Sequence, residues 1–181
     1  MKNLKLISIF AICAIFCVII VSSCGSQPTL RGQYYVNKTS TITSSPINEV
    51  WNKVIDFFAE NNIPIATLEK ESGIIVASNV TIKYPLCTME DEYGDLTNKN
   101  AWFAFPYVRK GCNHKVTCSF NVRVRDNGDG KTYISVNVSN ISGEYQVEFI
   151  NSFLQKQLTQ YTPITCEPTG NFEKALLKLF K

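Results

Sequence analysis

Residues 45–79 decide the fold, and they read Ser-Pro-Ile-Asn-Glu-Val-Trp-Asn-Lys-Val-Ile-Asp-Phe-Phe-Ala-Glu-Asn-Asn-Ile-Pro-Ile-Ala-Thr-Leu-Glu-Lys-Glu-Ser-Gly-Ile-Ile-Val-Ala-Ser-Asn. The first half predicts a helix, because Ser45 can cap the first N–H groups and Pro46 suits a first turn in which those groups lack helical partners. The Asn-Asn-Ile-Pro sequence at 61–64 ends it. Apolar side chains recur at helical spacing and form one face: Ile47, Val50, Trp51, Val54, Ile55 and Phe58.

The second half of this stretch predicts a β-hairpin. Residues 63–67 form its first strand, 69–73 its turn and 74–79 its returning strand. Neither a lone hairpin nor a lone amphipathic helix is stable in water, so the helix must bury its apolar face on the sheet that the hairpin begins.

The chain starts with a secretory signal. Lys2 and Lys5 form a short positive region, which an almost unbroken apolar run at 6–21 follows. This run is shorter than the roughly 20 apolar residues of a membrane-spanning helix. Residues 21–24, Val-Ser-Ser-Cys, resemble a bacterial lipobox, and the resemblance implies cleavage before Cys24 and acylation of that residue. The alternatives are an ordinary signal peptide with an incidental Cys24 thiol, and an uncleaved anchor.

This interpretation divides the chain into a lipoprotein signal peptide at 1–23, a lipid-anchored linker at 24–33 and a single folded domain at 34–181. Removal of the signal lowers the formal charge from +3 to +1. The sequence therefore predicts no nucleic-acid partner, and membrane attachment depends on acyl chains at about 0.8 kcal/mol per buried methylene. Acidic residues just after the lipid cysteine accompany surface export in some bacterial lipoproteins. Residues 25–33 contain none, which predicts an outer-membrane location at the periplasmic face.

Four of the cysteines lie in the domain: Cys87, Cys112, Cys118 and Cys166. An even number in an exported protein predicts two disulfides, and four cysteines allow three pairings. We favour Cys87–Cys166 with Cys112–Cys118, because the second pair closes a short loop at the start of a strand. A zinc site that includes His114 is the alternative. The spacings lack the close pairs of structural zinc sites, so no metal is expected.

The rest of the chain predicts more strands and two more helices. The clearest strand is 116–126, where apolar and polar residues alternate; a turn at 127–130 leads to a returning strand. We also expect a strand at 34–44 and a continuation of the hairpin strand to Tyr84. Apolar spacing predicts a helix over 144–161. A last helix begins after Thr169 as its cap, with Glu173 near a capping box, and its apolar face is Phe172, Leu176, Leu177 and Phe180.

Residues 88–115 form an irregular insert with an acidic part and a densely aromatic part. A loop of this length in a compact domain is usually functional or disordered. One interpretation is that its aromatic side chains close one end of the core. The other is that they form an exposed contact surface for a partner, and the residues concerned are Trp102, Phe103, Phe105 and Tyr107.

Several of these segments resemble a known family. Val50-Trp51, Asn61-Asn62-Ile63 and the run from Glu69 to Ile75 resemble the helix-grip domains of BamC-type outer-membrane lipoproteins. The run from Cys166 to Glu173 is similar to the start of the last helix in related bacterial lipoproteins. The resemblance covers about half of the mature chain. It implies an α+β fold, in which helices pack on one face of an antiparallel sheet, and a lipoprotein of adaptor or accessory type.

The sequence contains few residues that could support catalysis. His114 is the single histidine, and no nucleophile elbow, phosphate loop or metalloprotease motif is present. We therefore expect a non-enzymatic interaction module of an envelope complex, without a cofactor. The alternative is a carrier of a small apolar ligand, which predicts a sizeable apolar pocket lined by residues such as Phe120, Val122 and Leu177.

Overall fold

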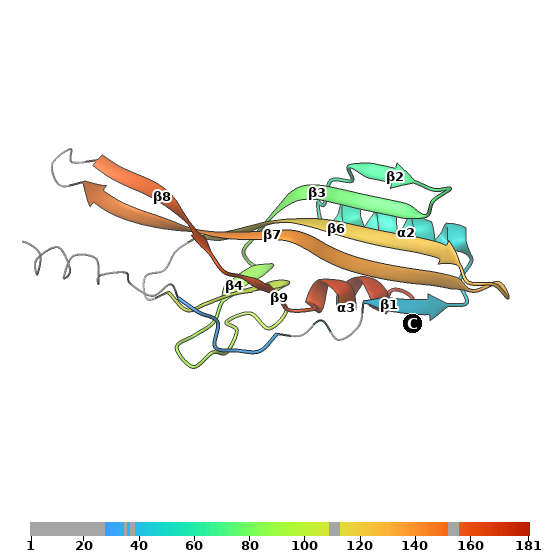
Figure 1. Cartoon of the computed structure of the whole chain (residues 1–181), viewed down its shortest axis with the longest axis horizontal. Helices are drawn as coiled ribbons and strands as arrows, with labels where there is room; N and C mark the ends of the chain where they lie inside the picture. The colour runs from blue at the N-terminus through green and yellow to red at the C-terminus, as the bar shows by residue number, and fades with distance from the viewer. Residues whose placement is uncertain (1–27, 35, 37–38, 109–112, 152–155) are drawn as a thin grey trace, which may run out of the picture.

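The computed structural model of this chain describes residues 28–34, 36, 39–108, 113–151 and 156–181 (Figure 1). In this part of the chain the fold is α+β with a mostly antiparallel sheet, as predicted, and it has two helices where the sequence predicts three. The signal peptide, Cys24 and the first linker residues lie outside it. The elements are β1 (Ser40–Thr43), α2 (Ile47–Glu60), β2 (Thr67–Glu69), β3 (Ile74–Lys83), β4 (Cys87–Met89), β5 (Phe103–Phe105), β6 (His114–Asp126), β7 (Thr132–Asn151), β8 (Lys156–Ile164), β9 (Glu167–Pro168) and α3 (Asn171–Lys178).

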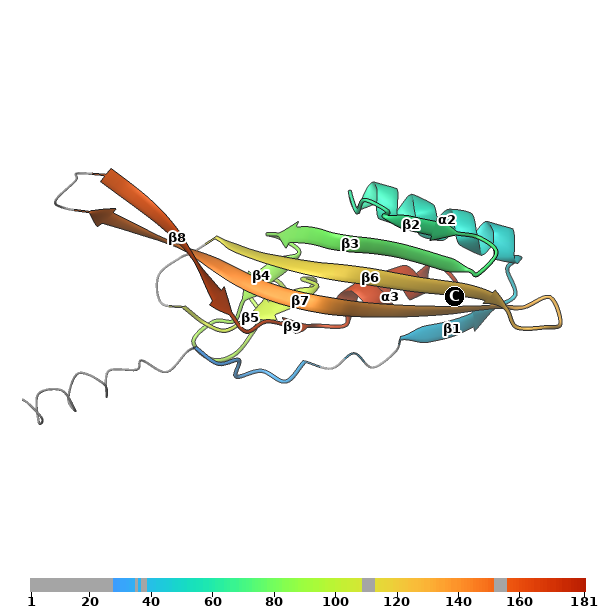
Figure 2. The ribbon, with the colours of Figure 1, turned by 45° about the horizontal axis from the view of Figure 1, so that its top comes forward.

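The larger sheet is built on β6 and β7. Its strand order is β1-β7-β6-β3-β2, and β8 pairs with the distal part of β7. Val122 of β6 lies between Ile75 of β3 and Val136 of β7. Figure 2 shows β3, β6 and β7 running side by side along the molecule. Both predicted hairpins are present, but the first strand of the first one is β2 at Thr67–Glu69, later in the chain than the predicted 63–67. The first predicted strand is shorter than expected, because β1 begins only at Ser40.

The two helices pack on the same face of this sheet. The ring of Phe120 on β6 lies 4.1 Å from that of Phe172 on α3 and 6.4 Å from that of Phe58 on α2. All three side chains are buried, and the core lies between the helices and this face. The opposite face is polar, since Arg123 and Arg125 of β6 are exposed there.

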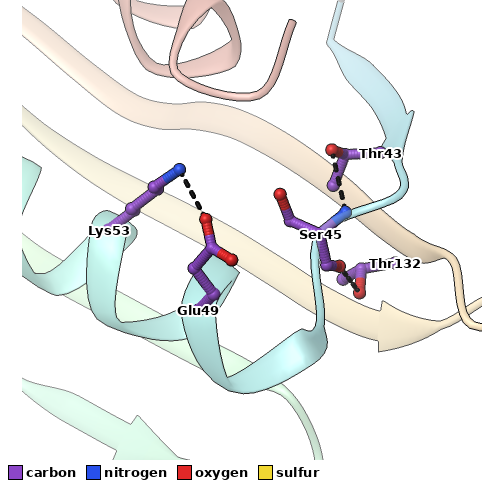
Figure 3. Close-up of polar contacts among 5 residues, drawn as sticks. All are labelled: Thr43, Ser45, Glu49, Lys53 and Thr132. Atoms are coloured by element: carbon purple, nitrogen blue, oxygen red, sulfur yellow. Dashed lines mark hydrogen bonds and ion pairs between the residues drawn. The ribbon is translucent and has the colours of Figure 1, made fainter.

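Polar contacts of the backbone fix the start of α2 (Figure 3). The N–H group of Ser45 donates to the Thr43 hydroxyl at 3.3 Å, and the Ser45 carbonyl accepts from the Thr132 hydroxyl at 2.8 Å. Pro46 occupies the N-cap, and no side chain caps the helix. The prediction of Ser45 as the cap is therefore wrong, because its backbone ties α2 to β1 and β7.

The start of α3 also differs from the prediction. Gly170, with a φ of 80°, is the N-cap residue. Thr169 precedes the cap; its hydroxyl donates to the Ala101 carbonyl at 2.5 Å and accepts from the Asn171 N–H at 3.3 Å. Glu173 is 2 % exposed instead of closing a capping box at the surface, and burial raises its pKa.

Within the described residues, neither helix is long and apolar enough to cross a membrane.

A second, smaller sheet organises the insert. β4 pairs in parallel with β5, which pairs antiparallel with β9 near the end of the chain. Cys87 lies opposite Phe103, and Phe103 lies opposite Pro168. Residues 88–108 are therefore ordered by strands that are distant in sequence.

The predicted helix at 144–161 is wrong, because these residues form strands. Residues 143–151 of β7 pair antiparallel with 156–164 of β8. This pair leaves the sheet as an arm at one end of the molecule (Figures 1 and 2). The segment has no helix cap, and an apolar run of this kind suits a strand as well as a helix. The pairing with β8 decides between the two.

Candidate functional site

An open pocket of about 510 Å³ lies where β3 ends and β6 begins. Its walls come from these two strand ends, from β4 and the segment after it, and from the base of the β7–β8 arm. The arm leaves the sheet at this end of the molecule (Figure 2). The lining residues are Lys83, Tyr84, Cys87, Thr88, Met89, Thr97, Asn113, His114, Lys115, Gln146 and Tyr161. A pocket of this size suits a small ligand or part of a larger one.

Two lysines stand directly opposite each other at this pocket. Lys83 of β3 pairs in register with Lys115 of β6. The Lys115 ammonium lies 2.9 Å from a carboxylate oxygen of Glu144, and 4.3 Å from the centre of the Tyr161 ring. Lys83 makes no ion pair with any described residue. Like charges opposite each other on neighbouring strands repel and destabilise a sheet. The positive charge of the two lysines also attracts anions to the pocket.

The rim of the pocket carries exposed tyrosines. Tyr84 is 78 % exposed and Tyr161 is 52 % exposed. Tyrosine side chains combine a large apolar ring with a hydroxyl, and they are enriched at interfaces for this reason. The pocket thus joins positive charge to aromatic surface.

Next to the pocket, the described end of the linker is bound to the domain. We call residues 28–34 the strap. The Glu90 side chain, 1 % exposed, accepts from the N–H groups of Arg31 at 2.9 Å and Gly32 at 2.7 Å, and from the Tyr34 hydroxyl at 2.8 Å. The Arg31 guanidinium also donates to the Glu92 carbonyl. Glu90 follows Met89, a pocket residue, so the strap is fixed beside the pocket.

The strap packs against the turn at 91–95, to which Arg31 donates a hydrogen bond. The Asp91 carboxylate accepts from the N–H groups of Tyr93 and Asp95, and these bonds hold its pKa below the ordinary value of 3.8. A β-carbon on Gly94 would lie 3.0 Å from the Arg31 side chain. Arg31 and Gly32 precede the predicted boundary between linker and domain at residue 33, Tyr34 follows it, and all three bond to Glu90 of the domain. The strap therefore crosses that boundary.

Three cysteines of the described residues are thiols: Cys87, which lines the pocket, Cys118 and Cys166. Burial and then the nearby charge of Cys166 raise the pKa of both Cys87 and Cys118 to about 12. Burial and then Glu167 raise that of Cys166 to about 12. Protonated thiols are poor nucleophiles. Cys166 contributes to the raised pKa of both Cys87 and Cys118, so it lies near each of them. Cys112 of the predicted second pair lies outside the described residues.

Oxidation of the exported protein is expected to join Cys87 to Cys166. Mass spectrometry of a non-reduced digest should recover the peptide that contains this bond. Cys166→Ser should abolish it, and Cys118→Ser should leave it intact. The bond would add about 2–4 kcal/mol to the free energy of unfolding. A peptide that joins Cys118 to Cys166 would contradict the predicted pairing.

The aromatic residues proposed as a contact surface are mostly internal. Trp102 is 5 % exposed, and Phe103 and Phe105 are fully buried. The Trp102 ring lies 4.9 Å from that of Phe172. The expectation of an exposed surface is wrong for these three residues, because β4 and β9 hold β5 against the core; the core-closing interpretation is correct. Tyr107, at 36 % exposure, is the one member of the predicted set that reaches the surface.

The place of the predicted apolar cavity is filled. Phe120, Val122 and Leu177 are each at most 2 % exposed, and the ring of Phe172 packs on Phe120. The pocket lies elsewhere and has a mixed polar lining. Among the described residues, no group of three or more potential ligand side chains is placed to hold a metal ion.

Sequence reasoning missed the residues that make the pocket and hold the strap. Lys83, Lys115 and Glu90 are ordinary surface types in the sequence. Only the register of β3 on β6 sets the lysines opposite each other. Glu90 stands in an acidic run at 90–95, where it looks like one more solvated charge, and its partners lie nearly 60 residues earlier.

The fold and site define an α+β domain with two helices on one face of a mostly antiparallel sheet and a cationic pocket at one sheet end. Comparison of the chain with models of protein families and with curated proteins gives no match in either case.

Proposed function

We propose that this chain is a lipid-anchored, non-enzymatic lipoprotein of the bacterial envelope, whose domain is an interaction or accessory module of an outer-membrane or periplasmic complex. The observation that carries the proposal is the strap. Arg31 stands seven residues after Cys24, and it is fixed to the domain through Glu90. A chain of seven residues spans at most about 25 Å. An acylated Cys24 would therefore hold the domain, and the surface around the pocket, close to the membrane.

The nature of the site supports a binding role. Among the described residues, the groups with raised pKa are buried thiols, the Tyr34 hydroxyl and the Glu173 carboxyl, and no hydrogen bond between them pairs a nucleophile with a base. The pocket rim instead offers Tyr84, Tyr161 and Lys83, which are residue types of contact surfaces. The filled interior argues against the apolar-carrier alternative.

A relation to the helix-grip domains of BamC-type lipoproteins is part of this proposal. Its support is the packing of α2 and α3 together on one sheet face through Phe58, Phe120 and Phe172. We place the domain at the periplasmic side of the outer membrane. Protease treatment of intact cells should then leave it whole, and degradation would put it at the cell surface.

Cys24→Ala is expected to abolish labelling of the protein by radioactive palmitate and its processing, because it removes the thiol that the lipid occupies. Cys17→Ala, which changes a cysteine inside the signal, is the matched control and should retain both. Mass spectrometry of the mature protein should show an acylated amino terminus at residue 24. An unmodified amino terminus would reject the lipid anchor.

The interaction role is tested by crosslinking in living cells. A photo-crosslinking residue in place of Tyr84, at the pocket rim, should trap one envelope protein. The same residue in place of Lys131, in the exposed turn after β6, is the control and should trap none. Trapping from neither position would contradict an interaction module even if Cys24 carries lipid.

A further inference from the structure

We propose that the pocket between β3, β4, β6 and the β7–β8 arm binds a phosphate-type anion. The first support is its charge. Lys83 and Lys115 both line it, and none of its described lining residues is acidic. Glu144, outside the lining, holds the Lys115 ammonium at 2.9 Å, while no carboxylate of a described residue forms an ion pair with Lys83. An anion placed between the two lysines would relieve their mutual repulsion.

The second support is the set of hydrogen-bond donors around that charge. The Tyr84 hydroxyl and the Asn113 amide line the pocket, and the Asn113 amide donates one of its two hydrogens to the Gln146 side-chain oxygen at 3.4 Å, so the other is left for a ligand. The Thr88 and Thr97 hydroxyls also line the pocket, but they bond to each other and to the Met89 carbonyl. A phosphate group accepts several hydrogen bonds at once, and lysine is a common partner for it as a mobile point charge. The volume of about 510 Å³ leaves room for the small polar group that carries the phosphate.

The third support is the position of the pocket, and this step rests on the proposed lipid anchor. Met89 lines the pocket, and the next residue, Glu90, holds the strap. Arg31 of the strap lies within about 25 Å of an acylated Cys24. Lipid headgroups and soluble phosphomonoesters share the chemistry that the pocket recognises. The short tether favours the headgroup, and the exposed rings of Tyr84 and Tyr161 suit a membrane boundary.

The test measures how fast acetic anhydride modifies Lys83 in the full mature chain, by mass spectrometry. The chain is placed in nanodiscs of digalactosyldiacylglycerol, a bilayer lipid without phosphate, or of this lipid with phosphatidylglycerol, at the same salt concentration. A third sample has digalactosyldiacylglycerol alone with added glycerol 3-phosphate. Lys174, exposed on α3 and away from the pocket, is the internal control. Bound phosphate should slow the acetylation of Lys83 several-fold and leave Lys174 unchanged.

A second measurement uses calorimetric titration with glycerol 3-phosphate. Lys83→Gln should weaken binding about tenfold, and Lys174→Gln should leave it unchanged. Protection of Lys83 only by phosphatidylglycerol identifies a lipid headgroup as the source, and protection by glycerol 3-phosphate identifies a soluble one. Equal acetylation of Lys83 in all three samples, or binding that Lys83→Gln does not weaken, overturns the proposal. Failure of the lipid anchor itself would appear separately, as loss of the chain from the nanodiscs.

Discussion

Glu90→Gln is expected to release the strap from the domain. The two carboxylate oxygens of Glu90 accept three hydrogen bonds, from the N–H groups of Arg31 and Gly32 and from the Tyr34 hydroxyl. A glutamine amide replaces one of those oxygens with a donor, so at least one N–H or O–H would face an N–H₂ group at a buried position. Loss of a hydrogen bond to a charged group costs about 2 kcal/mol. The opened strap should therefore become about 30-fold more populated.

Limited proteolysis measures this opening directly, because trypsin can cut after Arg31 only when the strap has left the surface. The rate of cleavage at this bond should rise by the same factor, while the free energy of unfolding of the rest of the domain changes little. Glu92→Gln is the matched control. Its side chain is exposed, and only its backbone carbonyl contacts the strap. An unchanged cleavage rate in Glu90→Gln would show that the carboxylate does not hold the strap.

The Tyr34 hydroxyl adds a pH dependence to the same contact. Burial and the hydrogen bond to Glu90 raise its pKa above the ordinary value of 10.0. A group whose folded pKa is raised contributes its full stability below the unfolded pKa and loses it as pH rises. The strap should therefore loosen above about pH 10, and Tyr34→Phe should remove that alkaline step while it weakens the strap at neutral pH.

The parts of the fold that the sequence predicts are those that local patterns specify. The face of α2 and the alternation of β6 follow from the spacing of Val50, Val54 and Phe58 and of residues 116–124, because each pattern repeats over enough residues to define its period. Apolar residues at three- and four-residue spacing predict a helix over 144–161, but such a run also suits a strand. Its true state depends on pairing with β8, which no local pattern reports.

The candidate site was harder to predict, because it depends on contacts between distant segments. The sequence leaves open whether Trp102, Phe103 and Phe105 close the core or form an exposed cluster, and the pairing of β5 with β9 near residue 167 is needed to decide. The Lys83–Lys115 pair depends on a register that crosses a bulge between Ala77 and Val80. The strap requires Glu90 to meet residues 31–34. Sequence spacing alone carries no information on any of these distances.

Gly73→Ala is expected to cost at least about 3 kcal/mol of the free energy of unfolding. Gly73 ends the turn between β2 and β3 with a φ of 68°, a conformation that side chains with a β-carbon rarely adopt. Its carbonyl accepts from the Val124 N–H at 2.8 Å, so the turn lies directly against β6. An added β-carbon would stand 1.9 Å from the Val124 carbonyl oxygen, which is backbone in the centre of the sheet.

The contribution of that contact can be separated from the cost of the backbone conformation. Gly128 has a φ of 80° and no atom within 4 Å of an added β-carbon. Gly128→Ala is therefore expected to cost about 1 kcal/mol, the penalty of a left-handed conformation alone. Urea unfolding of both variants measures the difference, which reports the displacement of β2 and β3 from β6. Equal losses would mean that the turn moves away from Val124 at no cost. β3 also supplies Lys83 of the pocket. A large loss of stability in Gly73→Ala would therefore show that the glycine of the Gly-Ile-Ile motif keeps this strand in place on β6.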